Sequence, residues 1–221
     1  NGSKWGINIS YLIQDIPGGI AQAFIIGRDF IGDSKVALIL GDNIFYGNEL
    51  SKDLCEAKSF EGATIFVSQV IDPQRYGIIE FNNRNEPISI EEKPKSPKSN
   101  FAITGLYFYD NKVVDIANNL KPSSRGELEI SDINKIYLKK NELNIHRFGR
   151  GHAWLDTGTH DSLLEASQFV STIENRQGLK ICCPEEIAYR KKYINREQLK
   201  KLSTNLSKTN YGKYLRLILS E

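Results

Sequence analysis

Two aspartates follow short apolar stretches of the chain. Asp42 comes after the run Val36–Leu40 and a glycine, and Asp156 comes after Trp154 and Leu155. In open α/β sheets ligands bind beyond the carboxyl ends of strands, where a carboxylate can hold a divalent cation whose other ligands are phosphate oxygens. Both aspartates also suit a turn or a helix cap. The sequence predicts a metal site if the two meet, and their spacing does not show that they do.

A second set of residues pairs carboxylates with cations. Glu92 and Lys93, within the segment Glu91–Pro94, follow a predicted strand, so the acid could bind sugar hydroxyls and the ammonium could bind a phosphate. Arg125 precedes a predicted helix, where its guanidinium could bind phosphate oxygens with several donors. An exposed charge run is the alternative at both places. These residues could therefore bind a sugar phosphate, or they could simply be solvated.

A third candidate site lies early in the chain, where Gln14 precedes Pro17–Gly19. The glutamine amide could hydrogen-bond the edge of a nucleotide base, and adjacent glycines let the backbone approach a nucleotide closely. A plain turn is the alternative. His146, His152 and His160 lack the spacing of a metal site or a catalytic triad, and no Walker loop, HExxH or GxSxG motif occurs. No common enzyme motif decides the function.

Composition places the chain among ordinary globular proteins. It has 221 residues, of which 40% are hydrophobic and 25% charged, and its formal net charge is +2. One or two domains are expected. The near balance of charges gives no reason to expect a nucleic-acid or membrane partner. No apolar run approaches the roughly 18 residues that cross a bilayer, and the first residues lack a signal-peptide core, so we expect a cytoplasmic protein.

The chain contains three cysteines and no methionine, and it begins with Asn1. Three cysteines, of which Cys182 and Cys183 are adjacent, cannot build a disulfide framework or a CxxC metal site. Because neither a translation start nor a targeting signal is present, we expect a fragment that lacks residues upstream of Asn1.

Apolar periodicity predicts alternating strands and helices. The predicted strands are 7–13, 36–40, 64–70, 77–81, 88–90, 101–109 and 143–148, with a hairpin turn at 82–85. The predicted helices are 20–31, 49–60, 112–120, 127–140, 160–176 and one from Pro184 onward. The run 36–40 is typical of a parallel strand covered on both faces. This alternation predicts an α/β core over residues 1–160 and a helical C-terminal region over residues 161–221.

Longer motifs occur in order along nearly the whole chain. They are PGGIAQ at 17–22, LGDNIFYG at 40–47, DPQRYG at 72–77, EEKP at 91–94, TGLYFYD at 104–110, KPSSRGELEISDIN at 121–134, GRGHAWLDTGTH at 149–160 and ENRQGLKICCPEEIA at 174–188. This series closely resembles the glucose-1-phosphate thymidylyltransferases, a family of sugar nucleotidyltransferases. LGDN or EEKP alone would indicate only a sugar nucleotidyltransferase, whereas FYG, RGELEI, AWLDTGTH and CPEEIA resemble the thymidylyltransferase branch. Uridylyl- and adenylyltransferases are less similar.

The resemblance implies a fold and a reaction. The fold is a Rossmann-like nucleotide-diphospho-sugar transferase fold, with a mixed, mostly parallel sheet flanked by helices and a helical C-terminal tail that packs on the core and on a neighbouring subunit. The reaction joins dTTP and glucose 1-phosphate, with Mg²⁺, to give dTDP-glucose and pyrophosphate on the route to dTDP-rhamnose. The resemblance also implies a homotetramer that dTDP-rhamnose inhibits by feedback at a subunit interface.

The resemblance further assigns roles to particular residues. Asp42 and Asp156 would hold Mg²⁺ and, together with Lys93 and Arg125 on the sugar phosphate, would be the catalytic residues. The implied substrate-binding residues are Gln14 and Gly19 for the thymidine, Glu92 and the backbone of Gly77 for the glucose hydroxyls, Ile103 and Tyr107 along the sugar, Trp154 at the phosphate end, and Tyr76. The implied regulatory residues are Tyr46, Gly47, Glu186 and Ile187.

The chain departs from the family at its beginning. The family starts with a glycine-rich loop of the form GGxGTRL and a lysine in a KxLLP segment, and neither occurs here. Because backbone N–H groups of such a loop cradle a triphosphate, we expect this stretch alone to be nearly inactive, with an open sheet edge. Two alternatives are a non-catalytic sugar-nucleotide-binding or regulatory protein, and a glycosyltransferase that holds a nucleotide sugar through Asp42 and a metal.

Overall fold

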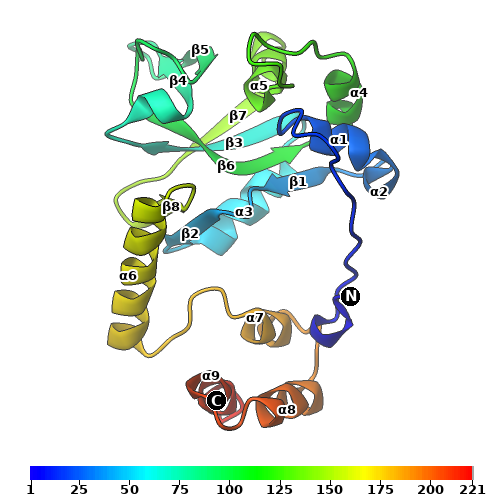
Figure 1. Cartoon of the computed structure of the whole chain (residues 1–221), viewed down its shortest axis with the longest axis vertical. Coiled ribbons are helices and arrows are strands. Elements are labelled where there is room, and N and C mark those ends of the chain that lie inside the picture. The colour runs from blue at the N-terminus through cyan, green and yellow to red at the C-terminus, as the bar shows by residue number, and fades with distance from the viewer. Residues whose placement is uncertain (221) are drawn as a thin grey trace. The chain divides into compact units, whose positions relative to one another are not determined.

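Strand β6 (Phe101–Tyr109) is the centre of a six-stranded sheet in the computed structural model, which describes residues 1–220 (Figure 1). β6 is an almost unbroken apolar run that is buried along nearly its whole length, as expected of a strand covered on both faces. The sheet has the order β5-β4-β6-β3-β7, and β1 pairs with the end of β6. The other strands are β1 (Val36–Ile39), β3 (Ala63–Gln69), β4 (Gly77–Phe81), β5 (Pro87–Glu92) and β7 (Leu143–Arg147).

Strand directions in this sheet are mixed. β3 and β7 are parallel, whereas the pairings β1–β6, β3–β6, β4–β5 and β4–β6 are antiparallel. The predicted α/β class with a mixed sheet flanked by helices is confirmed, but the prediction of mostly parallel pairing is wrong for the described residues. Part of the reason is local, because β4 and β5 are joined by the predicted short turn at 82–85, and such turns connect antiparallel strands.

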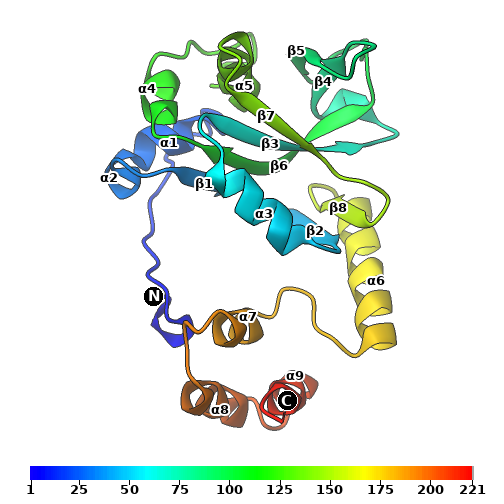
Figure 2. The ribbon, with the colours of Figure 1, turned by 180° about the vertical axis from the view of Figure 1, so that it is seen from behind.

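Helices cover both faces of the sheet. Successive side chains of a strand point to opposite faces, so the apolar residues of a buried strand need cover on each side. On one face, Ile65 and Tyr107 pack with helices α1 (Gln22–Ile26), α4 (Lys112–Asn118) and α5 (Ile130–Lys139). On the other face, Phe66 and Leu106 pack against α3 (Leu50–Ser59), which Figure 2 shows on the side turned away in Figure 1. The predicted helices at 49–60, 112–120 and 127–140 are thereby confirmed. The helix predicted at 20–31 is divided into α1 and α2 (Arg28–Ile31).

Of two strands predicted near the start of the chain, one does not form and the other forms with a different pairing. Residues 7–13 form no strand, since their alternating side chains lack an apolar cover and Tyr11 and Ile13 are 78% and 80% exposed. Residues 36–40 do contain β1, but β1 is antiparallel to β6 and is not covered on both faces, because Ile39 is 59% exposed. Periodicity therefore located this second strand correctly, but the predicted parallel pairing is wrong.

A separate two-stranded sheet joins distant parts of the chain. β2 (Asn43–Gly47) runs antiparallel to β8 (His152–Asp156), so that Asn43 lies opposite Asp156 and Gly47 opposite His152. A Cβ atom at Gly47 would lie 2.3 Å from the His152 ring, so the close approach of the two strands requires glycine there. Neither strand is predicted from the sequence.

The C-terminal helices form a compact unit that is distinct from the sheet-bearing unit Leu12–Ser162. This C-terminal unit contains the chain from Leu163 onward together with Asn1–Tyr11, which the sequence analysis places in the core. The predicted boundary at residue 160 lies close to the observed division. The helices of this part of the chain are α6 (His160–Gln177), which spans the division, α7 (Pro184–Arg190), α8 (Arg196–Asn205) and α9 (Asn210–Ile218).

Caps and a small apolar core hold the C-terminal unit together. α8 begins with a capping box of Asn195 and Gln198, and its Leu199 is fully buried beside Leu215 of α9. Trp5 joins this unit through its indole N–H, which donates to Glu185 Oε1 at 3.1 Å. None of the helices described within residues 1–220 has the length and apolarity that crossing a membrane requires.

Removing the hydroxyl of Tyr137 should destabilise the sheet-bearing unit. Tyr137 is fully buried, and its hydroxyl donates to Asp110 Oδ1 at 2.6 Å. Because Tyr137→Phe takes a donor from a buried carboxylate, it should lower the free energy of unfolding by about 1–3 kcal/mol in urea titrations. Tyr11→Phe is the control, since that side chain is 78% exposed and its change should stay within about 0.5 kcal/mol. Equal stability of the two variants would contradict this prediction.

Candidate functional site

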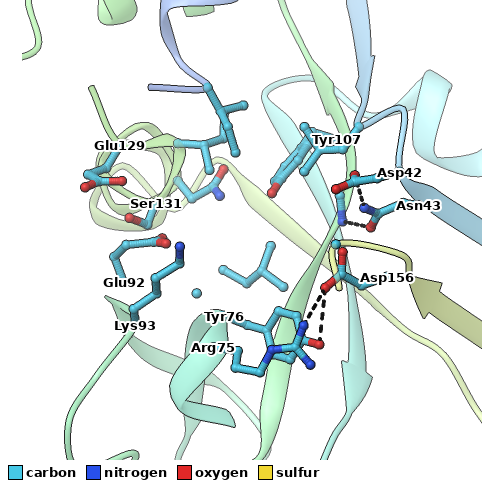
Figure 3. Close-up of a pocket in the computed structure, with 18 of the residues that line it drawn as sticks. Asp42, Asn43, Arg75, Tyr76, Glu92, Lys93, Tyr107, Glu129, Ser131 and Asp156 are labelled. Atoms are coloured by element: carbon cyan, nitrogen blue, oxygen red, sulfur yellow. Dashed lines mark hydrogen bonds and ion pairs between the residues drawn. The ribbon is translucent and has the colours of Figure 1, made fainter. Parts of the chain in front are cut away.

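A cavity of about 470 Å³ opens where strand ends of the sheet-bearing unit meet (Figure 3). Its walls come from the start of β2, the turn before β4, the end of β5, the middle of β6, the start of α5 and the end of β8. The predicted site residues that line it are Asp42, Tyr76, Gly77, Glu92, Lys93, Ile103, Tyr107, Arg125, Trp154 and Asp156. The structure thus brings the predicted metal-binding, phosphate-binding and sugar-binding residues to one cavity.

The β2–β8 ladder brings the two aspartates to the same edge of this cavity. Asn43 and Asp156 are register partners, so Asp42 and Thr157 extend the two strands side by side. The carbonyl of Asp42 accepts the backbone N–H of Thr157 at 2.9 Å and the Thr157 hydroxyl at 2.8 Å. Strand pairing therefore brings Asp42 and Asp156 together, which their spacing in the sequence could not show.

Asn43 fixes the orientation of the first aspartate. Its Nδ2 donates to Asp42 Oδ1 at 2.8 Å, while its Oδ1 accepts Trp154 Nε1 at 2.6 Å and the backbone N–H of Gly105 at 3.1 Å. A Cβ atom at Gly105 would lie 2.6 Å from Asn43 Oδ1, so β6 needs glycine at this point. Because two donors occupy Oδ1 of Asn43, its amide nitrogen is the atom that faces Asp42. The Asp42 carboxylate is thus held by a neutral group.

The second aspartate is held by a cation. Arg75, in the turn Pro73–Arg75 before β4, donates through Nη2 to Asp156 Oδ2 at 3.2 Å and through Nη1 to Asp72 Oδ2 at 3.0 Å. The Tyr76 hydroxyl lies 3.5 Å from the same Asp156 oxygen, and burial raises the pKa of Tyr76 to about 12. The Tyr76 ring contacts the Trp154 ring edge-on, with centroids 5.0 Å apart. Asp156 therefore carries a paired charge, in contrast to Asp42.

The two carboxylates fit a divalent cation that is completed by substrate oxygens. Across residues 1–220, Asp42 Oδ2 and Asp156 Oδ1 have no protein donor, so each carboxylate keeps one oxygen available. Oxygen ligands of this kind suit Mg²⁺, which commonly binds one or two carboxylates and substrate phosphates. The described residues contain no group of three or more His, Cys, Asp or Glu side chains arranged as a metal site. A cation bound here would therefore depend on a ligand such as a nucleotide for its remaining oxygens.

The opposite wall of the cavity carries two cations among acids. Arg125 Nη2 donates to Glu127 at 2.7 Å, and Arg125 also lies 3.7 Å from both Glu92 Oε1 and Glu129 Oε1. Lys93 has a left-handed φ of 42°, and its backbone N–H donates to the Tyr76 carbonyl at 3.0 Å. Its ammonium makes no ion pair with any residue in the described part of the chain. Lys93 is thus the cation of this wall that is most available to an anion.

Glu92 is a partly buried acid between these cations and the sheet. Its side chain is 20% exposed, and burial raises the pKa of its carboxyl. Glu92 lies opposite Gly77 in the β4–β5 ladder, and a Cβ atom at Gly77 would lie 3.2 Å from Glu92 Oε2. The glycine therefore leaves room beside an acid that is costly to keep charged without a ligand.

Neutralising Glu92 should change how stability depends on pH. A raised pKa in the folded state means that the fold is favoured while Glu92 is protonated, and that this advantage is lost as the pH rises through the raised pKa. Glu92→Gln should therefore be at least as stable as the wild type at pH 7, and its loss of stability between pH 4.5 and pH 7 should be smaller. Urea titrations at a series of pH values measure this, with the exposed Glu91→Gln as control. If the stability of Glu92→Gln depends on pH in the same way as that of the wild type, this prediction is wrong.

Gln14 and Gly19 lie together but are not among the residues that line this cavity. Gln14 Nε2 donates to the Gly19 carbonyl at 3.2 Å and to Gln22 Oε1 at 2.6 Å. Gly19 has a φ of 101°, and a Cβ atom there would lie 2.4 Å from the Leu128 carbonyl oxygen, so this loop packs tightly beside the start of α5. The next residue, Ile20, does line the cavity.

The predicted regulatory residues belong to different units. Tyr46 and Gly47 lie on β2 in the sheet-bearing unit, whereas Glu186 and Ile187 lie on α7 in the C-terminal unit. Glu186 Oε1 accepts Arg190 Nε at 2.8 Å, and Ile187 is 52% exposed. Their regulatory role stays a prediction.

The cavity also contains residues that the sequence analysis did not single out. Among them are Asn43, Arg75, Glu129, Ser131 and Asn134. Asn134 is fully buried, its Oδ1 accepts the Tyr109 hydroxyl at 2.6 Å, and its Nδ2 has no partner among the described residues. All five belong to the LGDN, DPQRYG and RGELEISDIN motifs, so the motifs were a signal for the segments although they did not identify these side chains.

The chain is similar in sequence to a known family and to named proteins. The pattern of the family described as Nucleotidyl transferase matches residues 1–173. A glucose-1-phosphate thymidylyltransferase of Xanthomonas campestris pv. campestris (strain B100) is 54% identical over 216 residues, which cover 97% of this chain and 73% of that protein. The enzyme of the same name from Neisseria meningitidis serogroup A is 53% identical over 222 residues, which cover 100% of this chain and 77% of that protein.

The chain is also similar to solved structures. A Bacillus anthracis protein of the glucose-1-phosphate thymidylyltransferase type, in complex with sucrose, is 44% identical with a TM-score of 0.67 and covers 76% of this chain and 67% of that one. A UDP-glucose pyrophosphorylase in complex with UDP-glucose has a TM-score of 0.66 at 22% identity and covers 74% of this chain and 66% of that one. At that lower identity the likeness concerns the fold alone.

Proposed function

The chain belongs to the Nucleotidyl transferase family and, within it, to the glucose-1-phosphate thymidylyltransferases, and we propose that it joins dTTP to glucose 1-phosphate to give dTDP-glucose and pyrophosphate. The observation that carries this proposal is the cavity itself. It has two carboxylates at one edge, Asp42 and Asp156, and two cations on the opposite wall, Lys93 and Arg125. A site that must align two phosphate groups needs both kinds of charge.

The reaction is a displacement at phosphorus. A phosphate oxygen of glucose 1-phosphate forms a bond to the α-phosphorus of dTTP, the bond from that phosphorus to the oxygen that bridges to the β-phosphorus breaks, and pyrophosphate leaves with the bonding electron pair. The protein needs no covalent intermediate for this step. Its contribution is to hold the two anions in line and to offset their repulsion.

Asp42 and Asp156 are proposed to hold Mg²⁺ through the oxygens that lack protein donors. When bound, Mg²⁺ would neutralise charge on the nucleotide phosphates. Asn43 would keep Asp42 in position, because its amide is fixed by Trp154 and by the backbone of Gly105. This arrangement supports Mg²⁺ without protein ligands beyond the two aspartates.

The sugar phosphate is proposed to bind the opposite wall. Lys93 and Arg125 would bind its phosphate, and Glu92 would accept hydrogen bonds from glucose hydroxyls beside the backbone of Gly77. The remaining proposed contacts are Tyr76, Ile103 and Tyr107 along the sugar, Trp154 at the phosphate end, and Gln14 with Gly19 at the thymidine. Arg125 would exchange its present ion pair with Glu127 for one with the phosphate.

Further parts of the proposal rest on the family resemblance. They are a homotetramer in the cytoplasm, a C-terminal region that packs on the core and on a neighbouring subunit, and dTDP-glucose as an intermediate towards dTDP-rhamnose. Feedback inhibition by dTDP-rhamnose would involve Tyr46, Gly47, Glu186 and Ile187.

Product identification tests the proposed reaction. The complete gene product is incubated with dTTP, labelled glucose 1-phosphate and Mg²⁺, and the label is followed by anion-exchange chromatography. We expect the label to elute with authentic dTDP-glucose. Unchanged substrates, with dTDP-glucose merely bound, would support a sugar-nucleotide-binding protein instead. Transfer of glucose from dTDP-glucose to an acceptor would support a glycosyltransferase.

A further inference from the structure

Arg75 occupies an unusual position between a proposed metal ligand and a second acid. Its guanidinium bridges Asp72 at 3.0 Å and Asp156 at 3.2 Å, and Figure 3 shows it pointing at the Asp156 carboxylate from the turn before β4. Its contact with Asp156 joins two segments that are 81 residues apart in the chain. Arg75 also lines the cavity, so it is part of the site and not only of the turn.

The two proposed metal ligands are therefore held in different ways. Asp42 is held by the neutral amide of Asn43, and no cationic side chain in residues 1–220 pairs with it. Asp156 has a side chain that is 18% exposed, and its charge is paired with Arg75, which is 40% exposed. Of the side chains that hydrogen-bond to the two aspartates, only Arg75, which contacts Asp156, is positively charged. A metal ion carries charge of the same sign.

We propose that Arg75 is a positioning residue that holds Asp156 in the metal-free protein in the place of a cation, and that it keeps metal binding weak until a nucleotide supplies further negative charge. This inference rests on the proposed Asp42–Asp156 metal site. A metal ion that approaches Asp156 meets a guanidinium 3.2 Å from Oδ2, and the two positive charges repel each other. The phosphates of a nucleotide would offset that repulsion.

Asp72 gives the guanidinium a second partner. When Asp156 turns one oxygen to a metal ion, Arg75 can keep its hydrogen bond to Asp72 and need not be left unpaired. Arg75 also lies over the Tyr76 ring, with its guanidinium carbon 5.2 Å from the ring centroid. Both contacts restrict how far Arg75 can move from the site.

Binding of Mn²⁺ to the substrate-free protein tests this inference without relying on activity. Free Mn²⁺ is measured by electron paramagnetic resonance in titrations of the wild type and of Arg75→Gln. Because the substitution removes a positive charge next to one ligand, we expect Arg75→Gln to bind Mn²⁺ about tenfold more tightly than the wild type. Arg75→Lys keeps the charge and should bind Mn²⁺ nearly as weakly as the wild type.

Two further variants separate the possible outcomes. Lys98→Gln removes a cation that pairs with Glu80 outside the cavity, so it should leave Mn²⁺ affinity unchanged. Asp156→Asn in the Arg75→Gln background should abolish the tenfold gain. If binding requires Asp156 but Arg75→Gln binds no more tightly than the wild type, the inference about Arg75 is wrong and the metal assignment stands. If binding does not depend on Asp156, the metal assignment fails and the inference fails with it.

Discussion

Replacing Asp156 by asparagine should lower kcat for dTDP-glucose formation by about 10²- to 10³-fold in the complete gene product. Asparagine keeps the size of the side chain but removes one of the two negative charges proposed to hold Mg²⁺. It also removes the carboxylate that pairs with Arg75 at 3.2 Å, so the cation next to the site loses a partner. The lost negative charge weakens the proposed hold on Mg²⁺, and with it the stabilisation of phosphate charge in the transition state, while Arg75 keeps its hydrogen bond to Asp72.

Steady-state kinetics at several Mg²⁺ concentrations measures this loss. Excess Mg²⁺ should restore little activity, because a missing charged ligand is not replaced by mass action alone. Asp161→Asn is the matched control, since it makes the same change at an exposed position in the first turn of α6 and should keep kcat within about twofold. A kcat for Asp156→Asn within about threefold of the wild type would refute the metal assignment.

Replacing Lys93 by glutamine should lower kcat/KM for glucose 1-phosphate by about 10- to 100-fold. Within residues 1–220 the Lys93 ammonium makes no ion pair, whereas Arg125 already pairs with Glu127 at 2.7 Å. Lys93 can therefore bind a phosphate without first breaking an existing contact. Loss of a charge-assisted hydrogen bond to an anion has an effect of this size.

The effect should fall on the sugar phosphate and not on the nucleotide. We expect KM for glucose 1-phosphate to rise while KM for dTTP changes by less than about threefold. Lys95→Gln, two residues further along and also exposed, is the control and should behave like the wild type. A larger change in the KM for dTTP than in the KM for glucose 1-phosphate would reverse the assignment of this wall.

Periodicity predicts elements that are long and have a strong apolar pattern. β6 is found over the predicted residues 101–109, and α5 lies within the predicted 127–140, because each has a strong apolar pattern that its own neighbours bury. The strand at 7–13 has an equally regular pattern and does not form. Alternation describes side-chain direction, and a strand also needs a partner, which the described chain does not provide there.

Single site residues at strand ends are predictable, but their meeting is not. Glu92 is the last residue of β5 and Lys93 follows it, so both lie at the predicted strand end, because residue type and strand end are both visible in the sequence. The approach of Asp42 to Asp156 depends on pairing of β2 with β8, two strands of five residues that are more than a hundred residues apart. Neither NIFYG of β2 nor HAWLD of β8 alternates apolar and polar residues, so periodicity does not identify them as strands.

Arg75 shows a different limit. It stands in the DPQRYG motif, but an arginine in a turn is ordinarily solvated, and nothing in the sequence shows that Asp156 lies within reach of it. Its contact is created by the turn before β4 and the end of β8 together. Side chains that act between distant segments are therefore recognised only in the folded chain.

Pyrophosphate release is the measurement that tests the central claim most directly. The complete gene product is given dTTP, glucose 1-phosphate and Mg²⁺ together, and then each pair of these with the third left out. We expect pyrophosphate to appear only with all three present, in an amount equal to the dTDP-glucose formed. No release from the complete mixture, or release that does not require glucose 1-phosphate, would contradict the proposed reaction.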